Sequence, residues 1–449
     1  MSVERSVDRD LFGDVVGPSS AVPRHRRNEA VFRQSSLMGV VVIDPLCAIS
    51  EGSGPWLLKK GLECLDLSPL LGTYEKYGGV AFHPRLLLGI LLFGFSEGIT
   101  SARELARRCR RDIAYQFISE GICPDHSTIT RFRRRLIYTE KELWKSVHKA
   151  LRSQDGYQKP SRIGIDGTKI SSAGAPVKIS KAELEQASGP VIASSDPDAV
   201  HLRGPHSRLF GYNAQIVVDL DSGYILATEV TTHKSDRDLL VPMLEKSIEV
   251  LGYVPDQVVA DKGYDFGESY QRCEELGVQA IVPPQSSPEE FWSADELGRV
   301  MCPMGEEPSK QRVTNERGRK VVVHSVPEST CRKCQFFNEC IGSARRRTLT
   351  APVGVDISLR ILSAQRARSP DGRQALRDRM SRLEAFFGRM KWNKRIVRFR
   401  LRGLAGARVE FSLVGLSEAV LNLGGTLQRL LHAIFQLLRV ESCAAVAKL

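Results

Sequence analysis

Two aspartates stand where short apolar runs end and a glycine follows closely. Asp166 ends the run 162–166 just before Gly167, and Asp261 ends the run 257–261 just before Lys262 and Gly263. Both runs have the pattern of buried strands, and ligand sites in open α/β sheets gather at the carboxyl ends of strands. If the two strands are neighbours, their carboxylates converge and need a shared proton or a cation. The pattern indicates a metal site, although one such aspartate alone is more often a turn cap.

A third acid is needed to complete a common magnesium site, and Glu384 is the best candidate. It lies inside a helical pattern between Leu383 and Phe386, and a carboxylate among such large apolar residues indicates a functional role. Arg377 precedes Glu384 by seven residues and Lys391 follows it by seven, so all three share one helical face. That face would pair a metal-binding carboxylate with cations able to hold phosphates.

The elements that must position these acids change character along the chain. Helical periodicity covers about 55–152, with a helix opened by His83-Pro84, a capping box at Ser101 and Glu104, and a further helix from Asp125. The turn between the last two predicts a helix-turn-helix-like unit. Strand periodicity follows over 160–285, with a hairpin around residues 221–223 and then strand, helix, strand and helix, which indicates a mixed α/β sheet. Helical character returns at 371–392, and a final pair of helices is expected over 405–438.

Basic residues gather in two stretches. Between residues 101 and 135 nine arginines face four acids, and between 377 and 403 ten basic residues face two acids. These basic residues either contact phosphate groups of a bound partner or simply form a solvated helical or extended surface, and the first interpretation is favoured. The predicted DNA contacts are Arg131, Arg133, Arg134, Arg135, Lys391, Lys394, Arg395 and Arg398.

Four of the ten cysteines fall in a stretch rich in Pro, Gly and charge, over 286–368. Cys331 and Cys334 form a C-x₂-C pair, Cys340 follows, and Cys302 stands well upstream. This spacing matches part of a zinc-binding motif, in which His324 could replace one thiol as a ligand. The alternatives are thiols that bind no metal and an iron–sulfur cluster. The other cysteines are scattered and are best explained by packing.

Composition bounds the class of protein. The 449 residues carry a formal net charge of +12 at a pI near 9.3, with 42% apolar and 26% charged residues, which is ordinary for a globular protein of several domains. The longest apolar runs are too short or too interrupted for a membrane span, and no secretory signal is visible. We therefore expect a cytoplasmic, nucleoid-associated protein in a reducing compartment, and a disordered leader over 1–40.

The sequence resembles the insertion-sequence transposases that use a DDE triad on a ribonuclease H-like fold, over about 55–425. The segments that carry the resemblance are weak singly but specific in their order and spacing. They are residues 74–84, 91–94, 99–103 and 124–133 in the helical part, and 166–169, 211–215, 260–264 and 384–391 in the catalytic part.

The resemblance implies an α/β ribonuclease H-like catalytic core, an all-α N-terminal DNA-binding domain at 55–152 and a small cysteine-rich insertion. The core would comprise 160–285 and, after the insertion at 286–368, the segment 369–438 with its catalytic helix, basic segment and C-terminal helices. Asp166, Asp261 and Glu384 would hold two Mg²⁺ or Mn²⁺ ions, with a structural Zn²⁺ in the insertion. The partner would be double-stranded DNA, namely element ends and target, bound by a homo-oligomer.

One departure bears on activity. Related enzymes often show Tyr and Arg seven and four residues before the glutamate, where this chain has Arg377 and Met380; Arg379 and Arg382 are nearby cations but lack that helical phase. Two rivals therefore remain beside a transposase that cuts and joins DNA. One is a catalytically inactive DNA-binding protein derived from a transposase, and the other is a related metal-dependent nuclease that cuts without joining.

Overall fold

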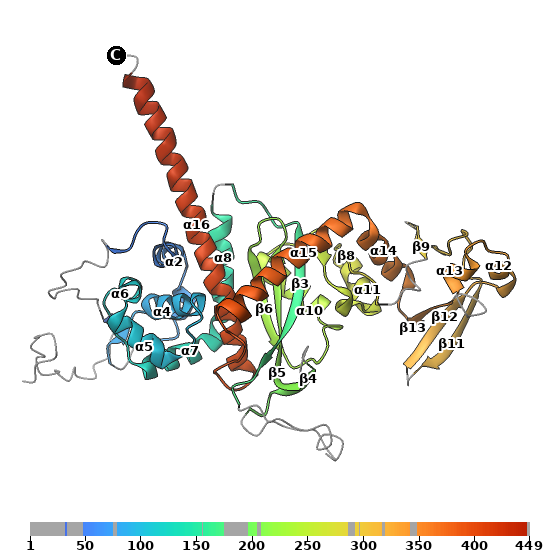
Figure 1. Cartoon of the computed structure of the whole chain (residues 1–449), viewed down its shortest axis with the longest axis horizontal. Coiled ribbons are helices and arrows are strands. Elements are labelled where there is room, and N and C mark those ends of the chain that lie inside the picture. The colour runs from blue at the N-terminus through green and yellow to red at the C-terminus, as the bar shows by residue number, and fades with distance from the viewer. Residues whose placement is uncertain are drawn as a thin grey trace, which may run out of the picture. The chain divides into compact units, whose positions relative to one another are not determined.

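The computed structural model describes residues 32–33, 48–74, 79–154, 156–174, 196–203, 208–285, 292–295, 297–316, 319–341 and 348–446. The chain forms two compact units, Met1–Ala150 with Val420–Leu449, and Leu151–Ala419, whose helices and strands are labelled in Figure 1. The predicted leader lies outside the described residues except for β1 (Phe32–Arg33), which pairs in parallel with β2 (Ala81–Phe82).

The first unit is built from helices. They are α2 (Gly54–Glu63), α3 (Ser68–Leu71), α4 (Pro84–Ser96), α5 (Ala102–Arg111), α6 (Ile113–Ser119), α7 (His126–Arg135), the 3₁₀ turn η1 (Leu136–Tyr138) and α8 (Glu140–Arg152), joined by the second part of α16 (Leu404–Val446). As expected, His83 caps α4 by accepting the Arg85 N–H, and Asp125 caps α7 by accepting the Thr128 N–H at 2.7 Å. Helix α4 is buried along nearly its whole length, so it forms the centre of this unit.

One local expectation in this unit was wrong. Ser101 is the N-cap of α5, but its side chain makes no capping hydrogen bond, and Glu104 pairs with Arg107 and Arg108 one turn along the helix. Residues 121–124 connect two helices as expected, and the helix before them is α6, which the sequence pattern did not separate from α5. The start of α6 is capped by Asp112, which accepts the Ala114 N–H at 3.0 Å.

The second unit is organised by a six-stranded sheet. Its strands are β3 (Arg162–Ser171), β4 (Val200–Arg203), β5 (Arg208–Asp219), β6 (Ile225–Thr231), β7 (Gln257–Val259) and β8 (Gln279–Ile281), in the order β4-β5-β3-β7-β8 with β6 also on β5. Strand β5 is antiparallel to β3, β4 and β6, whereas β3, β7 and β8 are mutually parallel. The predicted β5–β6 hairpin and the mixed α/β architecture are confirmed.

Side-chain alternation along β3 separates the two faces of this sheet. Ile163 and Ile165 pack with α10 (Leu240–Leu251) and α11 (Gly267–Glu275) in one hydrophobic core. The intervening Gly164 points the other way, where a Cβ would meet Arg379 of α15 (Pro370–Gly388). Asp166 shares the parity of Gly164, so the sheet directs it to the face that α15 covers.

The segment after β8 has a core of its own. Strands β9 (Ser293–Ala294) and β10 (Val300–Met301) form a short antiparallel pair, and β11 (Lys310–Glu316), β12 (Arg319–Ser325) and β13 (Thr348–Pro352) form a three-stranded sheet (Figure 1). The short helices α12 (Glu328–Arg332) and α13 (Phe337–Ile341) lie between β12 and β13 in sequence. Residues of β9, β10, α12, α13, β13 and α14 (Ile357–Arg368) share a second cluster of buried side chains around Trp292.

The C-terminal elements differ from expectation in one respect. After α15 comes a π-helical turn, η4 (Arg389–Asn393), then an irregular basic segment, and then a single long helix, α16, where a pair of helices was predicted. The Gly424-Gly425 pair does not break α16: a Cβ at Gly424 would lie 2.0 Å from the Leu57 carbonyl oxygen, so glycine permits close packing on α2. Among the residues that the structure describes, no helix combines the length and apolar character that crossing a bilayer demands.

Candidate active site between β3 and β7

Asp166 lies on the central strand β3 and is largely enclosed. Its side chain is 21% exposed, its Oδ1 accepts the N–H of Gly167 at 2.8 Å, and the same oxygen lies 3.0 Å from Nη2 of Arg379. Burial raises the pKa of Asp166 to about 6, with Asp261 and Asp236 adding to the rise while Arg379 opposes it. The carboxylate therefore stands in an environment that disfavours its charge unless a cation is close.

Asp261 follows β7, the parallel neighbour of β3. It caps the 3₁₀ turn η2 (Lys262–Tyr264) by accepting the Gly263 N–H at 2.7 Å, which is the turn-cap role considered from the sequence. Its Oδ2 also lies 3.7 Å from the same Nη2 of Arg379, and its side chain is 49% exposed. The two aspartates thus converge on one cation, as expected if their strands are neighbours.

Arg379 is the residue that the sequence argument set aside. Its side chain is buried, and its Nε donates to the carbonyl of Ile165 at 2.8 Å. Its Nη2 is buried too and makes no aligned hydrogen bond, although it lies near both carboxylates. A signal was present in the sequence: Arg379 falls in the stripe Ala375, Leu383, Phe386 and Met390, all buried, at spacings of three and four residues.

Glu384 lies on α15 but is exposed. It does not share the buried stripe of Arg379. Within the described residues no three Asp, Glu, His or Cys side chains form a group that could hold a metal ion. The structure therefore brings Asp166 and Asp261 to a common point and leaves Glu384 outside it. The two aspartates fit a divalent cation, because carboxylate oxygens are the ligands that Mg²⁺ and Mn²⁺ prefer and an oxygen of each already lies near the same positively charged group, Arg379 Nη2.

Lys391 reaches the same face from the π-helical turn. Its Nζ donates to the Thr168 hydroxyl, two residues beyond Asp166 on β3. Burial lowers the pKa of Lys391, and the nearby Asp166 opposes that change. Single π turns inside helices are frequent at functional sites.

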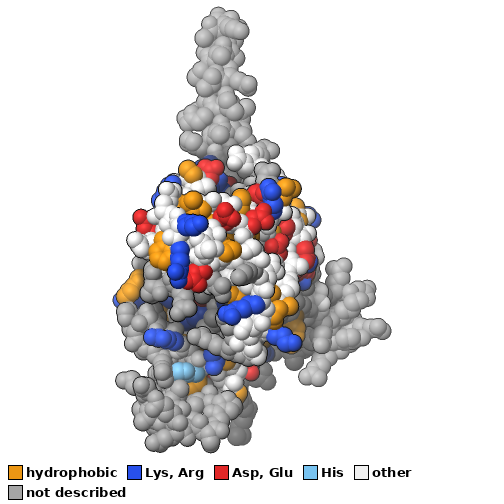
Figure 2. All heavy atoms as spheres, turned by 90° about the vertical axis from the view of Figure 1, so that its right-hand side faces the viewer, with side chains coloured by type: hydrophobic (Ala, Val, Ile, Leu, Met, Phe, Trp, Pro, Cys, Tyr) orange, Lys and Arg blue, Asp and Glu red, His pale blue; other side chains and the backbone are white. Residues whose placement is uncertain are grey.

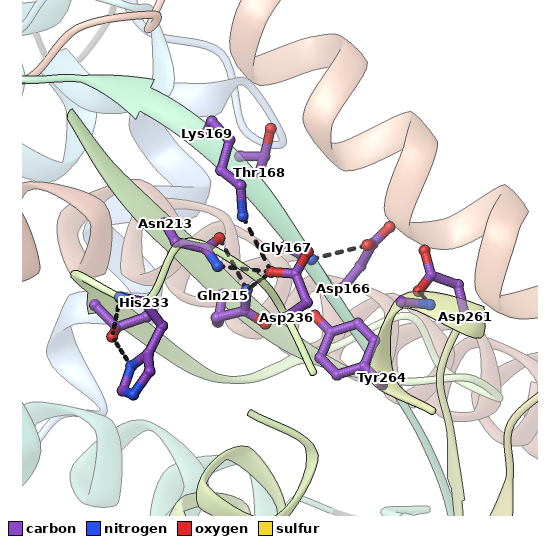
Figure 3. A network of polar contacts seen from close by, with 12 residues as sticks. Asp166, Gly167, Thr168, Lys169, Asn213, Gln215, His233, Asp236, Asp261 and Tyr264 are labelled. Carbon is purple, nitrogen blue, oxygen red and sulfur yellow. Dashed lines mark hydrogen bonds and ion pairs between the residues drawn. The ribbon is translucent and has the colours of Figure 1, made fainter. Parts of the chain in front are cut away.

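A polar network lies next to Asp166 on the other face of β3 (Figure 3). Asp236 accepts hydrogen bonds from Asn213 at 2.6 Å and Gln215 at 2.8 Å, and it pairs with Lys169 at 3.3 Å. Gly167 makes room for it, since a Cβ there would meet the Gln215 side chain at 2.1 Å. The sequence argument missed Asp236, which follows no strand-end pattern.

The predicted DNA-binding arginines of α7 have different surroundings. Arg131 and Arg134 are exposed. Arg135 donates to the Thr73 carbonyl at 2.7 Å and stacks on Tyr74. Arg133 is 3% exposed, donates to the Thr100 carbonyl at 2.7 Å and lies over the Phe95 ring, so it contributes to the interior of the helical unit.

A basic hollow of about 220 Å³ lies between α5 and the start of α7. It is lined by Arg103, Ala106, Arg107, Arg110, Arg111, Asp125 and His126. These arginines belong to the first basic stretch but were not singled out from the sequence, because only three-dimensional packing of α5 against α7 reveals that they share a concave surface.

The second basic stretch is partly neutralised and partly fastened to the sheet. Lys394 pairs with Glu418, which also lies 3.7 Å from Arg389. Arg395 is exposed, with a φ of 54° in the left-handed region. Arg398 forms an isolated parallel bridge with Ser171 at the end of β3. The extended conformation expected around Arg398 is thus present, in backbone contact with the strand that carries Asp166.

The cysteines near β10, α12 and α13 do not form the expected metal cluster. Cys331 and Cys340 are buried in the hydrophobic cluster around Trp292, against which Cys302 packs, and Cys334 Sγ accepts the Phe336 N–H at 3.4 Å. In the described part of the chain they form no metal-binding group, so zinc is not supported.

Figure 2, which faces the β11–β13 side of Figure 1, shows basic and acidic side chains interspersed on the visible surface.

Comparison with known proteins gives the class of this chain. Residues 301–424 match the family model described as a transposase DDE domain, and residues 56–135 match that of a transposase domain (DUF772). No curated protein matches the sequence. The chain thus carries two transposase domains, one of the DDE class, and it is a DNA transposase. The first match includes Glu384, whereas Asp166 and Asp261 lie outside both.

Two solved structures are similar over much of the chain. The piggyBac transposase synaptic complex with hairpin DNA is 11% identical, with 85% of this chain and 75% of that chain covered and a TM-score of 0.34. The Drosophila P element transposase strand transfer complex is 12% identical, with 68% and 61% covered and a TM-score of 0.23. At these scores neither likeness supports a statement about fold or function.

Proposed function

We propose that this transposase belongs to an insertion sequence and both cuts the element ends and joins them to target DNA at a site formed by Asp166, Asp261 and Glu384. The observation that carries the proposal is the convergence of Asp166 and Asp261, from adjacent parallel strands, on one buried cation. Carboxylates placed in this way need positive charge, and phosphodiester chemistry at two carboxylate-bound metal ions provides a use for it.

A ribonuclease H-like core is the fold that we propose for the second unit. The short strand β4, which also pairs with β5, is left out of this comparison. With β3 counted as the first strand, the others lie in the order β6-β5-β3-β7-β8, which is third, second, first, fourth and fifth, and only the second strand is antiparallel to the rest. This order places the first and fourth strands side by side. Asp166 lies within the first strand, just beyond the part that pairs with the fourth, and Asp261 follows the fourth.

The proposed roles follow from position. Two bound Mg²⁺ or Mn²⁺ ions would supply activation of a water or a 3′-hydroxyl and stabilisation of the leaving oxygen. Asp166 and Asp261 would hold the ions, and Glu384 would join them from α15. Lys391, half-buried beside Thr168, would hold a phosphate against β3. Because cleavage and joining each exchange one phosphodiester oxygen for another, one site serves both.

DNA contacts are proposed on both units. In the first unit the exposed Arg131 and Arg134 and the basic hollow lined by α5 arginines would meet phosphates. In the second, Arg395 and Arg398 would do so beside the proposed active site, where Arg398 is bound through its backbone to the end of β3. Binding of two element ends would require a homo-oligomer.

The test is incubation of the protein with labelled element-end DNA and Mg²⁺ or Mn²⁺. Cutting followed by joining is the expected result; cutting alone indicates a nuclease, and binding alone indicates an inactive DNA-binding relative. Asp166→Asn, Asp261→Asn and Glu384→Gln should each abolish cleavage while DNA binding persists. Full metal-dependent cleavage by one of these variants would remove that residue from the triad.

A further inference from the structure

We infer that Arg379 is an internal counter-cation for the metal site: it holds Asp166 and Asp261 together while no metal is bound, and it competes with the ions that replace it. The inference rests on the proposed metal-binding role of the two aspartates. It assigns a positioning role to a residue outside the triad.

Two nitrogens of the Arg379 guanidinium have different functions, one as an anchor on the strand and one as a counter-charge for the carboxylates. Nε is anchored on the Ile165 carbonyl at 2.8 Å, one residue before Asp166. Nη2 extends to the carboxylates, 3.0 Å from Asp166 and 3.7 Å from Asp261, without an aligned hydrogen bond to either. The anchor fixes the side chain, while the end between the aspartates is held only by charge.

The surroundings explain why a cation is needed there. Asp166 is largely enclosed and lies with Asp261 around the same Nη2, so two ionised carboxylates placed there without a cation would repel each other. Removing one partner of a buried ion pair leaves an uncompensated charge, which is more damaging than never having the pair. Arg379 avoids that state in the metal-free protein.

The same arrangement opposes metal binding. A divalent ion that bridges Asp166 and Asp261 would approach the position of Nη2, and two cations so close repel each other. Nη2 must therefore move aside, while Nε can keep its bond to Ile165. Arg379 thereby lowers the affinity of the empty site for metal.

The experiment measures Mn²⁺ binding by electron paramagnetic resonance, and thermal unfolding in EDTA and in Mn²⁺, without DNA. Arg379→Met keeps the length and removes the charge; we expect a lower unfolding temperature in EDTA, recovery in Mn²⁺, and Mn²⁺ affinity raised about tenfold. Arg379→Lys restores the charge and should return the affinity toward that of the unmodified protein. Arg373→Met, at an exposed position on the same helix, is the matched control and should change neither quantity.

Several outcomes would overturn the inference. If Arg379→Met destabilises the protein but binds Mn²⁺ no more tightly, Arg379 is only structural. If that variant is unfolded in EDTA, refolding on addition of Mn²⁺ supports the inference and failure to refold contradicts it. The double variant Arg379→Met/Asp261→Asn lacks the repulsion between the two carboxylates, so it should fold in EDTA and be more stable there than Arg379→Met. If the double variant is no more stable than Arg379→Met, the inference is also contradicted.

Failure of the proposed function gives a different result. If Asp166→Asn and Asp261→Asn leave Mn²⁺ binding intact, the aspartates are not the metal site and the proposed function loses its basis. If both abolish Mn²⁺ binding while Arg379→Met leaves the affinity unchanged, only the role given to Arg379 is wrong.

Discussion

Asp166 on β3 with Asp261 after β7, and the cysteines around α12 and α13, were each predicted from sequence patterns to bind metal, but the fold arranges the two sets differently. Asp166 and Asp261 are 95 residues apart and converge on one guanidinium. Cys331 and Cys334 are three residues apart, but one thiol is buried among apolar side chains and the other accepts a backbone N–H. Adjacent parallel strands fix where their ends lie, whereas short spacing in an irregular segment does not fix where side chains point.

Loss of DNA cleavage is the largest effect expected on the aspartate side of this comparison. Asp166→Asn should lower end cleavage on the order of 10³-fold, because the variant removes a ligand charge where transition-state charge is stabilised. Cys334→Ser should leave the cleavage rate unchanged. Both rates are measured with labelled end DNA in Mg²⁺, and a comparable loss in the cysteine variant would erase the contrast between the two regions.

The pH dependence of stability sharpens the same contrast. The folded pKa of Asp166, about 6, lies above that of an unfolded aspartate, so stability from this group is present at low pH and is lost as the pH rises from about 4 to about 6. In EDTA the free energy of unfolding of the unmodified protein should therefore fall by about 2 kcal/mol more than that of Asp166→Asn between pH 4 and pH 8, because the variant has no carboxyl group to titrate at this position. Urea unfolding at both pH values checks this; equal differences at the two would contradict it.

The cysteines should behave as packing residues. Cys331→Ser places a hydroxyl in an apolar cluster and should cost about 1–2 kcal/mol of unfolding free energy, whereas Cys334→Ser, at a half-buried thiol, should cost less. Neither cost should depend on a chelator. Unfolding of the unmodified protein by chelator, together with bound zinc in metal analysis, would show instead that these thiols form a metal site.

Arginines of α7 extend the comparison to two residues of one type. Arg134→Ala should weaken DNA binding a few-fold and reduce the salt slope by about one, because an exposed phosphate contact is lost. Arg133→Met should instead lower stability and leave the salt slope unchanged, since Arg133 is bonded inside the unit. Fluorescence titrations at several salt concentrations distinguish the two; a flat salt dependence for the unmodified protein would contradict the DNA-binding assignment.

Much of the local structure was predictable because its causes are local. The β5–β6 hairpin follows from Asp221-Ser222-Gly223, and the starts of α4 and α7 follow from His83 and Asp125. Asp166 and Asp261 were found from apolar runs followed by glycine, although β3 does not end at Asp166 and continues to Ser171. Their closeness was conditional on strand pairing, which no local pattern states.

What escaped prediction depends on which face of an element is buried. Arg379 was judged by its phase relative to Glu384, but the sheet packs against the stripe containing Leu383 and Phe386, and Arg379 belongs to that stripe. The continuity of α16 escaped because Gly424 signals a helix end in isolation and a close helix contact in the fold. Asp236 escaped because its partners come from β3 and β5.

The division of the chain has a consequence for its synthesis. The helical unit combines Met1–Ala150 with Val420–Leu449, and Gly424 of its last helix packs on the backbone of Leu57. A ribosome therefore completes the residues of the second unit before it delivers the last helix of the first. At 5–20 residues per second, Gly424 is added roughly 20–70 s after Leu57, on which it packs. During that interval α2 lacks the helix that packs on Leu57, so the order of translation makes the helical unit the last part to reach its final packing.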